Sequence, residues 1–383
     1  MPKTFVLAPD SFKESMTAEQ ASQAMQRGIE KVCPDAICIS VPMADGGEGT
    51  VDALVSALKG QKIACEVTGP FPAQKVKTYF GLIDDGRTAV IEMAKANGIH
   101  LIEPAQRDPF LTTTLGTGEM IKTALDLGVS KIIIGLGGSV TNDAGAGMAQ
   151  ALGVKFLDDN NIQVAVGGGQ LDQIKIVDIL GLDSRLQHIE IIIASDVTNP
   201  LCGVNGAAYI FGPQKGATPQ MVQQLDQNLS HFAEVVESAL KLSKQNIPGA
   251  GAAGGLGFGL MAFAGASIHS GVEIVIEQTQ LAEKIAQVDY VFTGEGCIDF
   301  QTKFGKTPFG VAQVAKRLNK PVIAFAGVIG DDIDELYALG FTQIIGINPS
   351  DCTLEDAMQN AQRHLEDAVV TVLNKLESDH AKF

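Results

Sequence analysis

The sequence contains no tryptophan and no C-x-x-C pair among its six cysteines. It also has no apolar run of the roughly 20 residues that a transmembrane helix needs, and its apolar start is too short for a signal peptide. The cysteines do not cluster with the scattered histidines at zinc-ligand spacing, which is typical of reduced thiols. We therefore expect a cytoplasmic protein with no membrane partner.

Positive charge is also scarce, because 28 Lys and Arg stand against 44 Asp and Glu and give a net charge of -16. Proteins that bind nucleic acid neutralise phosphates with Lys and Arg, and this sequence has no basic block. We therefore expect no nucleic-acid partner. The negative net charge does not exclude an anionic substrate, because a few local cations, helix N-termini or a bound divalent metal can make the electrostatic potential inside a cleft positive.

What the sequence does contain is typical of an α/β enzyme. Its 383 residues are 45% hydrophobic and include 42 glycines, many of which must serve turns. This length exceeds one comfortable hydrophobic core, so it predicts two domains of roughly 150 to 200 residues each.

Strand and helix patterns alternate at both ends of the chain. Strand-like segments lie at residues 4–8, 36–42, 290–293, 322–326 and 343–347, and helix-like segments at 17–32, up to 58, at 309–318 and from 354. In the middle, strand-like segments follow one another at 62–68, 75–83 and 87–93. The alternation predicts a doubly wound, flavodoxin- or Rossmann-like α/β domain built from both chain ends, and the middle predicts an inserted α/β domain with a mixed sheet.

We place the doubly wound domain at residues 1–70 plus 288–383 and the inserted domain at 71–287. An active site is expected in the cleft between the two domains. The sequence leaves the oligomeric state open, with a homodimer as one option.

A polar turn follows the apolar strand-like run at residues 131–134. It contains Ser139, Thr141, Asn142 and Asp143, and small and apolar residues of helical character come after it. Glycines let backbone N–H groups approach a ligand, and a helix N-terminus attracts anions. The turn therefore suits a carboxylate or phosphate, although the same side chains can simply cap the helix.

Two standard nucleotide motifs fail on inspection. The end of a Walker A loop is present at 305–307, but Phe300 occupies the place of its first glycine. Gly249, Gly251 and Gly254 satisfy G-x-G-x-x-G, but no strand precedes them. This counts against a nicotinamide-dependent hydroxy-acid dehydrogenase, which remains the alternative enzyme. A periplasmic-type binding protein is disfavoured because no signal peptide is evident.

Six loops carry unusual strings in a fixed order. They are APDSFKESMTA at 8–18, MADGGEGT at 43–50, GGSVTNDAGAGMAQALG at 137–153, SDVTNPLCG at 195–203, FGPQKGA at 211–217 and TGEGCIDFQTKFGKTPFGVA at 293–312. Together they closely resemble the glycerate kinase family of the type without a Walker A loop, over nearly the whole chain. The resemblance implies a kinase that uses ATP and Mg²⁺ to phosphorylate D-glycerate, with 2-phosphoglycerate favoured and 3-phosphoglycerate as the alternative product.

In-line phosphoryl transfer needs cations on the phosphates and carboxylates that bind Mg²⁺ or accept the hydroxyl proton. The loops supply lysines and an ample set of carboxylates, which includes Asp10 and Asp143. The residues that we predict to be catalytic are Asp196, Lys13, Asp45, Glu295 and Asp299. Substrate- or phosphate-binding residues are predicted to be Ser11, Ser139, Thr141, Asn142, Lys215, Lys303 and Lys306.

We predict the metal ligands to be Asp45, Glu48 and Asp196. Asp45 and Glu48 lie three residues apart at a strand-to-helix turn, so both carboxylates can face one ion. The alternative is an ordinary acidic first turn that interacts with the helix dipole. Asp196 directly follows a strongly apolar strand, which would present it rigidly to a cleft.

Overall fold

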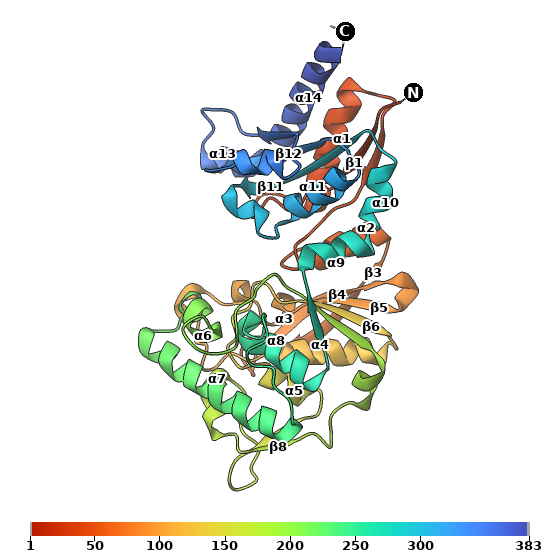
Figure 1. Cartoon of the computed structure of the whole chain (residues 1–383). Coiled ribbons are helices and arrows are strands. Elements are labelled where there is room, and N and C mark those ends of the chain that lie inside the picture. Colours follow the sequence, from red (N-terminus) through yellow and green to blue (C-terminus); the bar gives the residue numbers. More distant parts are fainter. Residues whose placement is uncertain (1, 381–383) are drawn as a thin grey trace. The chain divides into compact units, whose positions relative to one another are not determined.

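The structure is a computed structural model that describes residues 2–380. The chain is α/β and divides into two compact units (Figure 1). Unit 1 comprises the chain up to Asp45, Asp52–Lys59 and the chain from Val272 onward. Unit 2 comprises Gly46–Val51 and Gly60–Gly271. No helix among residues 2–380 combines the length and the apolar character needed to cross a membrane.

Unit 1 contains a five-stranded parallel sheet with the order β13-β12-β11-β1-β2. Its strands are β1 (Thr4–Leu7), β2 (Ile37–Ser40), β11 (Tyr290–Ile298), β12 (Val322–Ile329) and β13 (Gln343–Gly346). From β1 the chain proceeds to β2 on one side, and it returns through β11 on the other side of β1. The strand order therefore reverses between β1 and β11, and open α/β sheets bind ligands outside the carboxyl ends of strands at such a point.

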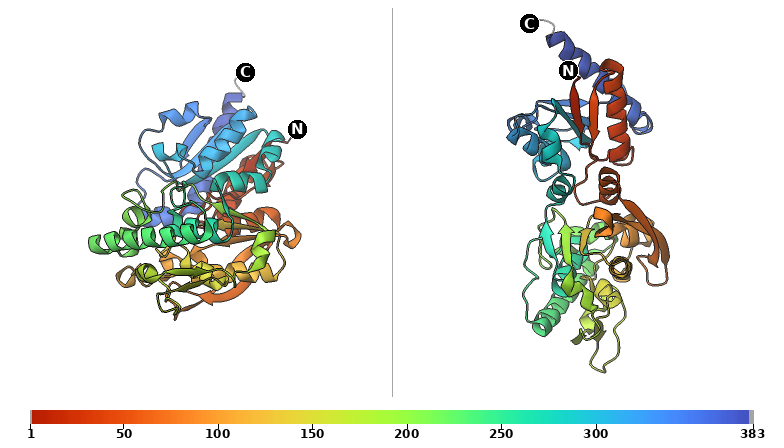
Figure 2. Two further views of the ribbon diagram at one scale, coloured as in Figure 1. Left: turned by 60° about the horizontal axis from the view of Figure 1, so that its bottom comes forward. Right: turned by 90° about the vertical axis from the view of Figure 1, so that its right-hand side faces the viewer.

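Helices cover both faces of this sheet. The helices of unit 1 are α1 (Ala18–Val32), α2 (Thr50–Leu58), α9 (Gly271–Gln278), α10 (Leu281–Ala286), α11 (Thr307–Arg317), α12 (Asp334–Ala338), α13 (Leu354–Gln359) and α14 (Ala361–His380). Figure 2 shows α1 on one face, where it packs against α14, and α11 on the other. Helix α1 begins where the sequence predicts, because Thr17 and Gln20 form a capping box at its start.

Unit 2 contains a mixed sheet with the order β10-β9-β6-β5-β4-β3. Its strands are β3 (Gln61–Thr68), β4 (Lys75–Ile83), β5 (Thr88–Glu92), β6 (Lys131–Gly135), β9 (Glu190–Ala194) and β10 (Ser267–His269). Strand β4 runs antiparallel to β3 and β5, and the remaining pairs are parallel. A separate antiparallel pair consists of β7 (Lys155–Leu157) and β8 (Ile176–Asp178).

The helices of unit 2 are α3 (Ala94–Asn97), α4 (Leu115–Asp126), α5 (Ala146–Ala151), α6 (Ala207–Phe211), α7 (Pro219–Leu240) and α8 (Ala252–Phe263). Their core includes edge-to-face contacts of Phe156 with Phe232 and Phe263, and of Phe232 with Phe258. Such pairs add geometric specificity to apolar burial.

The boundaries of the compact units along the chain differ from those of the predicted domains. Strand β3 lies in the sheet of unit 2 because it pairs with β4 along its whole length, from Gln61 opposite Leu82 to Thr68 opposite Lys75. Helices α9 and α10 lie before the predicted limit at 287, yet the chain belongs to unit 1 from Val272 onward. The chain therefore passes between the units at 45–46, 51–52, 59–60 and 271–272, whereas the predicted domains meet at 70–71 and 287–288.

Candidate active site

Carboxylates gather where β1 and β11 end in unit 1. We call Asp10, Glu295 and Asp299, together with Lys306 and Thr307, the carboxylate cluster. Asp10 follows β1, and its backbone N–H donates to Gly294 O of β11 at 2.8 Å. The cluster thus lies at the point where the strand order of the sheet reverses.

Asp10 is held from two sides. The Thr307 hydroxyl donates to its Oδ2, and the Ser11 N–H donates to its Oδ1 at 2.6 Å. Burial is the main cause that raises the pKa of Asp10 to about 7, the negative charge of Asp45 raises it further, and the bonds from Thr307 and Ser11 oppose the rise. A carboxylate in this state is poised to hold a proton or to meet a cation.

Glu295 lies within β11 and accepts a hydrogen bond from the Thr302 hydroxyl at 3.1 Å. Burial raises its pKa to about 7, Lys306 acts against this rise, and the charges of Asp10 and Asp45 add to it. Lys306 Nζ lies 3.7 Å from Glu295 Oε1. The carboxylates of Asp10, Asp45 and Glu295 therefore repel one another, and the charge of Lys306 does not cancel the effect of burial on the pKa of Glu295.

The predicted residues Asp299 and Lys306 hold the loop after β11 in shape. Asp299 is the N-cap of the 3₁₀ turn Phe300–Lys303 and accepts from Gln301 N at 2.9 Å. Lys306 Nζ lies 3.8 Å from Asp299 Oδ1 and donates to Cys297 O at 3.1 Å. These two members of the carboxylate cluster thus have structural partners in β11 and in the loop that follows it.

The other predicted lysines of unit 1 differ in their surroundings. Lys13 is exposed in the loop between β1 and α1, and a Cβ built on Gly296 of β11 would lie 3.4 Å from its backbone nitrogen. The structure thus brings this loop, with Ser11, against the strand that carries Glu295. Lys303 instead donates to Glu335 of α12 and lies over the Phe304 ring.

In unit 2 the polar elbow, which we define as residues 139–143, follows β6 and is buried, and its first residue, Ser139, is 7% exposed. Asp143 is fully buried, and its carboxylate accepts from Thr114 N at 2.8 Å, Gly145 N at 3.1 Å and Gly147 N at 3.2 Å. The last two donors belong to the start of α5. Burial raises the pKa of Asp143, and these hydrogen bonds oppose the rise. Asp143 therefore fixes the elbow and serves as a cap, which was the structural alternative for this turn.

Lys215 reaches the same elbow from a segment far away in sequence. It is 1% exposed, and its Nζ donates to Ser139 Oγ at 2.8 Å and to Thr141 O at 2.6 Å. Burial lowers the pKa of Lys215 to about 7, against the charge of Asp143. The structure thus brings the predicted residues Lys215, Ser139 and Thr141 together.

Next to Lys215, polar atoms are buried without a partner. Within residues 2–380 these include Thr141 Oγ1 and both side-chain polar atoms of Asn142, and both residues are 0% exposed. Buried polar groups are nearly always hydrogen-bonded in proteins, so atoms of this kind call for a water molecule or a ligand group. Lys215 and the elbow thus offer one lysine, one amide and one hydroxyl to a small polar occupant.

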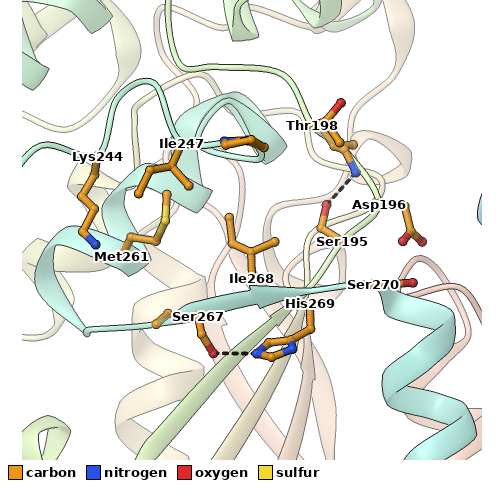
Figure 3. A pocket seen from close by; sticks show the side chains of 13 residues that line it. Ser195, Asp196, Thr198, Lys244, Ile247, Met261, Ser267, Ile268, His269 and Ser270 are labelled. Atoms are coloured by element: carbon orange, nitrogen blue, oxygen red, sulfur yellow. Dashed lines mark hydrogen bonds between the residues drawn. The ribbon is translucent and has the colours of Figure 1, made fainter.

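Asp196 lines a cavity of about 550 Å³ in unit 2 (Figure 3). The walls are largely apolar, with Ile247, Met261 and Ile268 among them, and Lys244 lies on the opposite side from Asp196 in this view. Asp196 follows β9 as predicted and is exposed. It lines a different part of unit 2 from the residues of the polar elbow that are described above.

The predicted metal pair Asp45 and Glu48 divides between the units. Asp45 belongs to unit 1, where its charge acts on Asp10 and Glu295. Glu48 is exposed in the segment Gly46–Val51, which belongs to unit 2. This segment is fixed there because Val51 N donates to the buried Glu92 at 2.7 Å.

Two residues of the carboxylate cluster were not singled out from the sequence. Asp10 appeared only in the inventory of loop carboxylates, although its position after a buried strand was the available signal. Thr307 gave no signal, because its contact with Asp10 spans 297 residues of sequence.

The chain can be compared with known proteins on this basis. The family model described as "Glycerate kinase family" matches residues 5–377. A Haemophilus influenzae protein named glycerate kinase is 50% identical over 361 residues, which cover 94% of this chain and 95% of the relative. An Escherichia coli protein named glycerate 2-kinase is 50% identical over 356 residues, 93% of each chain.

The fold agrees with these matches. A crystal structure of a candidate glycerate kinase 2 from Salmonella typhimurium LT2 has a TM-score of 0.90 at 46% identity, and the match covers 100% of both chains. The α/β fold and the comparisons define an enzyme of the kinase class. The chain belongs to the glycerate kinase family, as the resemblance of its loops predicted.

Proposed function

We propose that this protein transfers the γ-phosphoryl group of ATP to a hydroxyl group of D-glycerate and releases phosphoglycerate and ADP. Family membership over residues 5–377 supports the reaction class. The observation in the fold that carries the proposal is the carboxylate cluster, in which Asp10 and Glu295 both have a pKa raised to about 7. Phosphoryl transfer to an alcohol needs such groups for the hydroxyl proton and for the cation on the phosphates.

We assign the base to Glu295. A general base works best when its pKa lies near the working pH, because it is then both available and strong enough to accept a proton. Glu295 and Asp10 meet this condition. A bound cation would lower the pKa of the carboxylate it touches, so one carboxylate cannot serve well as metal ligand and base together.

Mg²⁺ fits the remaining carboxylates. Asp10 and the predicted ligand Asp45 offer hard oxygen donors whose mutual repulsion a divalent cation relieves. When bound there, Mg²⁺ would neutralise charge on the transferring phosphoryl group. Glu48 and Asp196 stay predicted as further ligands from unit 2.

The carboxylate of D-glycerate requires a separate anion site. A three-carbon acid buries little apolar surface, so its affinity depends on charge-assisted hydrogen bonds. The polar elbow supplies the unpartnered side chains of Thr141 and Asn142, with Lys215 beside them, whereas the loop with Ser11 and Lys13 supplies an exposed cation. We propose the elbow as the first choice for the carboxylate, and the loops that carry Lys13 and Lys303 as the second.

The cavity beside Asp196 suits the adenosine part of ATP. Its volume of about 550 Å³ and its apolar wall of Ile247, Met261 and Ile268 match what a flat heteroaromatic ring requires. Asp196 also stays proposed as a catalytic residue and metal ligand. Asp196→Asn should therefore lower turnover far more than it lowers the midpoint of thermal unfolding. Near-normal turnover in a folded Asp196→Asn protein would remove Asp196 from the catalytic residues.

A coupled assay of ADP release with D-glycerate, with and without Mg²⁺, tests the whole proposal. ADP release that does not depend on D-glycerate would contradict it, and D-glycerate-dependent reduction of a nicotinamide cofactor would support the alternative dehydrogenase. Phosphorus NMR of the product distinguishes 2-phosphoglycerate, which we favour, from 3-phosphoglycerate. We further propose a cytoplasmic enzyme that acts on this small molecule with no nucleic-acid or membrane partner, and gel filtration would test for a homodimer.

A further inference from the structure

Three side chains with different metal-binding atoms converge in unit 1, outside the carboxylate cluster. Cys352 precedes α13, Asp356 lies in the first turn of α13, and His364 lies near the start of α14. One ligand atom from each residue lies within 4.8 Å of the other two. The turn between the two helices brings the histidine back to the thiol and the carboxylate.

The spacing of these atoms suits one small cation. Asp356 Oδ2 lies 3.1 Å from Cys352 Sγ and 3.6 Å from His364 Nε2. Tetrahedral bonds of about 2.0 Å to nitrogen or oxygen and about 2.3 Å to sulfur place ligand atoms about 3.3 to 3.6 Å apart. The observed separations lie close to these values.

The tautomer of His364 follows from its other neighbours. Asn348 Nδ2 donates to Gly327 O at 2.8 Å, which orients the amide so that its Oδ1 faces His364 Nδ1 at 3.0 Å. His364 Nδ1 must therefore carry the proton, and in the neutral ring Nε2 presents a lone pair. A histidine that ligates a metal is held in this way by an acceptor on its second nitrogen.

The carboxylate is oriented by the same kind of contact. Asn360 Nδ2 donates to Asp356 Oδ1 at 2.7 Å, so Oδ2 is the oxygen that faces the thiol and the imidazole. Two acceptors, Oδ2 and Nε2, thus face each other at 3.6 Å, and the Cys352 thiol lies beside Oδ2. Such a pair requires either a proton on the imidazole or a cation between the atoms.

We propose that Cys352, Asp356 and His364 bind one divalent ion of the zinc class. Thiolate and imidazole ligands select Zn²⁺ and Co²⁺ over the Mg²⁺ of phosphoryl transfer. The thiol proton leaves to solvent when the sulfur binds the ion. Asp356 is 48% exposed and His364 is 11% exposed, so water completes the coordination. The ion would fasten the loop after β13 to α13 and α14.

Titration with Co²⁺ tests this site independently of glycerate phosphorylation. The full-length protein is stripped with a chelator, returned to Mg²⁺ buffer and titrated with Co²⁺ while absorption is recorded. We expect a thiolate-to-cobalt charge-transfer band that saturates at one equivalent and disappears when Zn²⁺ is added. Cys352→Ser abolishes this band, whereas the matched variant Cys65→Ser in β3 of unit 2 keeps it.

The contact of Asn348 with His364 provides a second test, which leaves all three proposed metal ligands in place. Asn348→Ala should weaken Co²⁺ binding about 10- to 100-fold, because the partner that orients the His364 ring is lost. The proposal is overturned if the unaltered protein shows no charge-transfer band, or if Cys352→Ser shows a band of equal intensity. Should Cys352→Ser fail to fold by circular dichroism, unchanged Co²⁺ affinity in Asn348→Ala overturns it instead.

Discussion

The carboxylate cluster of unit 1 and the polar elbow of unit 2 both follow strands of parallel pairs, but burial acts on them in opposite directions. In the cluster it raises the pKa of Asp10 and Glu295 to about 7, and in the elbow it lowers the pKa of Lys215 to about 7. Each region is therefore close to losing its charge at neutral pH. On the proposed function, a bound cation would favour the charged form of the carboxylate cluster, and a bound anion would favour the charged form of Lys215.

The largest effect is expected in the cluster. Glu295→Gln removes the proposed base and keeps its shape, so kcat should fall by about 10² to 10⁴. Glu366→Gln is the matched control, because Glu366 is a carboxylate of unit 1 that pairs with Arg27 and Lys31 of α1. The measurement is steady-state ADP release with circular dichroism of both variants. Equal kcat in the two variants would show that Glu295 is not the base.

The next effect concerns the elbow. Lys215→Met removes the buried cation and its bonds to Ser139 and Thr141. A hydrogen bond to a charged group contributes about 1.5 to 3 kcal/mol, so the KM for D-glycerate should rise about 10- to 150-fold while the KM for ATP stays nearly constant. Lys175→Met, in which an exposed lysine is replaced, is the control. A rise in the KM for ATP alone would assign Lys215 to the triphosphate.

The same contrast predicts opposite pH dependences of stability without Mg²⁺. Between about pH 4 and pH 7 the folded state holds protons on Asp10 and Glu295 that the unfolded state has lost, so unit 1 loses stability as the pH rises. Between about pH 7 and pH 10 the unfolded state holds a proton on Lys215 that the folded state has lost, so unit 2 gains stability as the pH rises.

Amide hydrogen exchange, corrected for the intrinsic exchange rate, can follow each unit separately across this range. Asp10→Asn should flatten the acidic part of the profile of unit 1, and Lys215→Met should flatten the basic part of the profile of unit 2. If unit 1 does not lose stability between about pH 4 and pH 7, or if unit 2 does not gain stability between about pH 7 and pH 10, burial is not the cause of the shift in that unit.

The sequence predicted the elements whose signals are local. Helix α1 begins after Thr17 because its capping box lies within four residues, and β9 ends at Ala194 as its apolar run does. Strand β11 was expected to end at Thr293 but continues to Ile298. Its last residues are strand because they pair with β12, for example Cys297 with Val328, and a single segment does not reveal its partner.

The candidate sites, too, could be predicted from the sequence only where their signals are local. Loop chemistry identified Ser139, Thr141 and Lys215 as candidates, but their contact across 74 to 76 residues comes only from the fold. The histidines were judged to lack metal-ligand spacing, and His364 does lie eight positions beyond Asp356. A turn between α13 and α14 brings the two together, which periodicity along one helix could not predict.

The smallest expected effect separates two lysines that the sequence treated alike. Lys303 already donates to Glu335, and Lys13 is exposed beside the strand that carries Glu295. A lysine engaged by a surface carboxylate has less to offer a substrate, although such a pair contributes little to stability. Lys13→Ala should therefore raise the KM for D-glycerate or ATP more than Lys303→Ala does, with little change in the unfolding midpoint of either. If Lys303→Ala has the larger effect, Lys303 must leave Glu335 when substrate binds, and Lys303→Ala with Glu335→Gln would then show a non-additive KM.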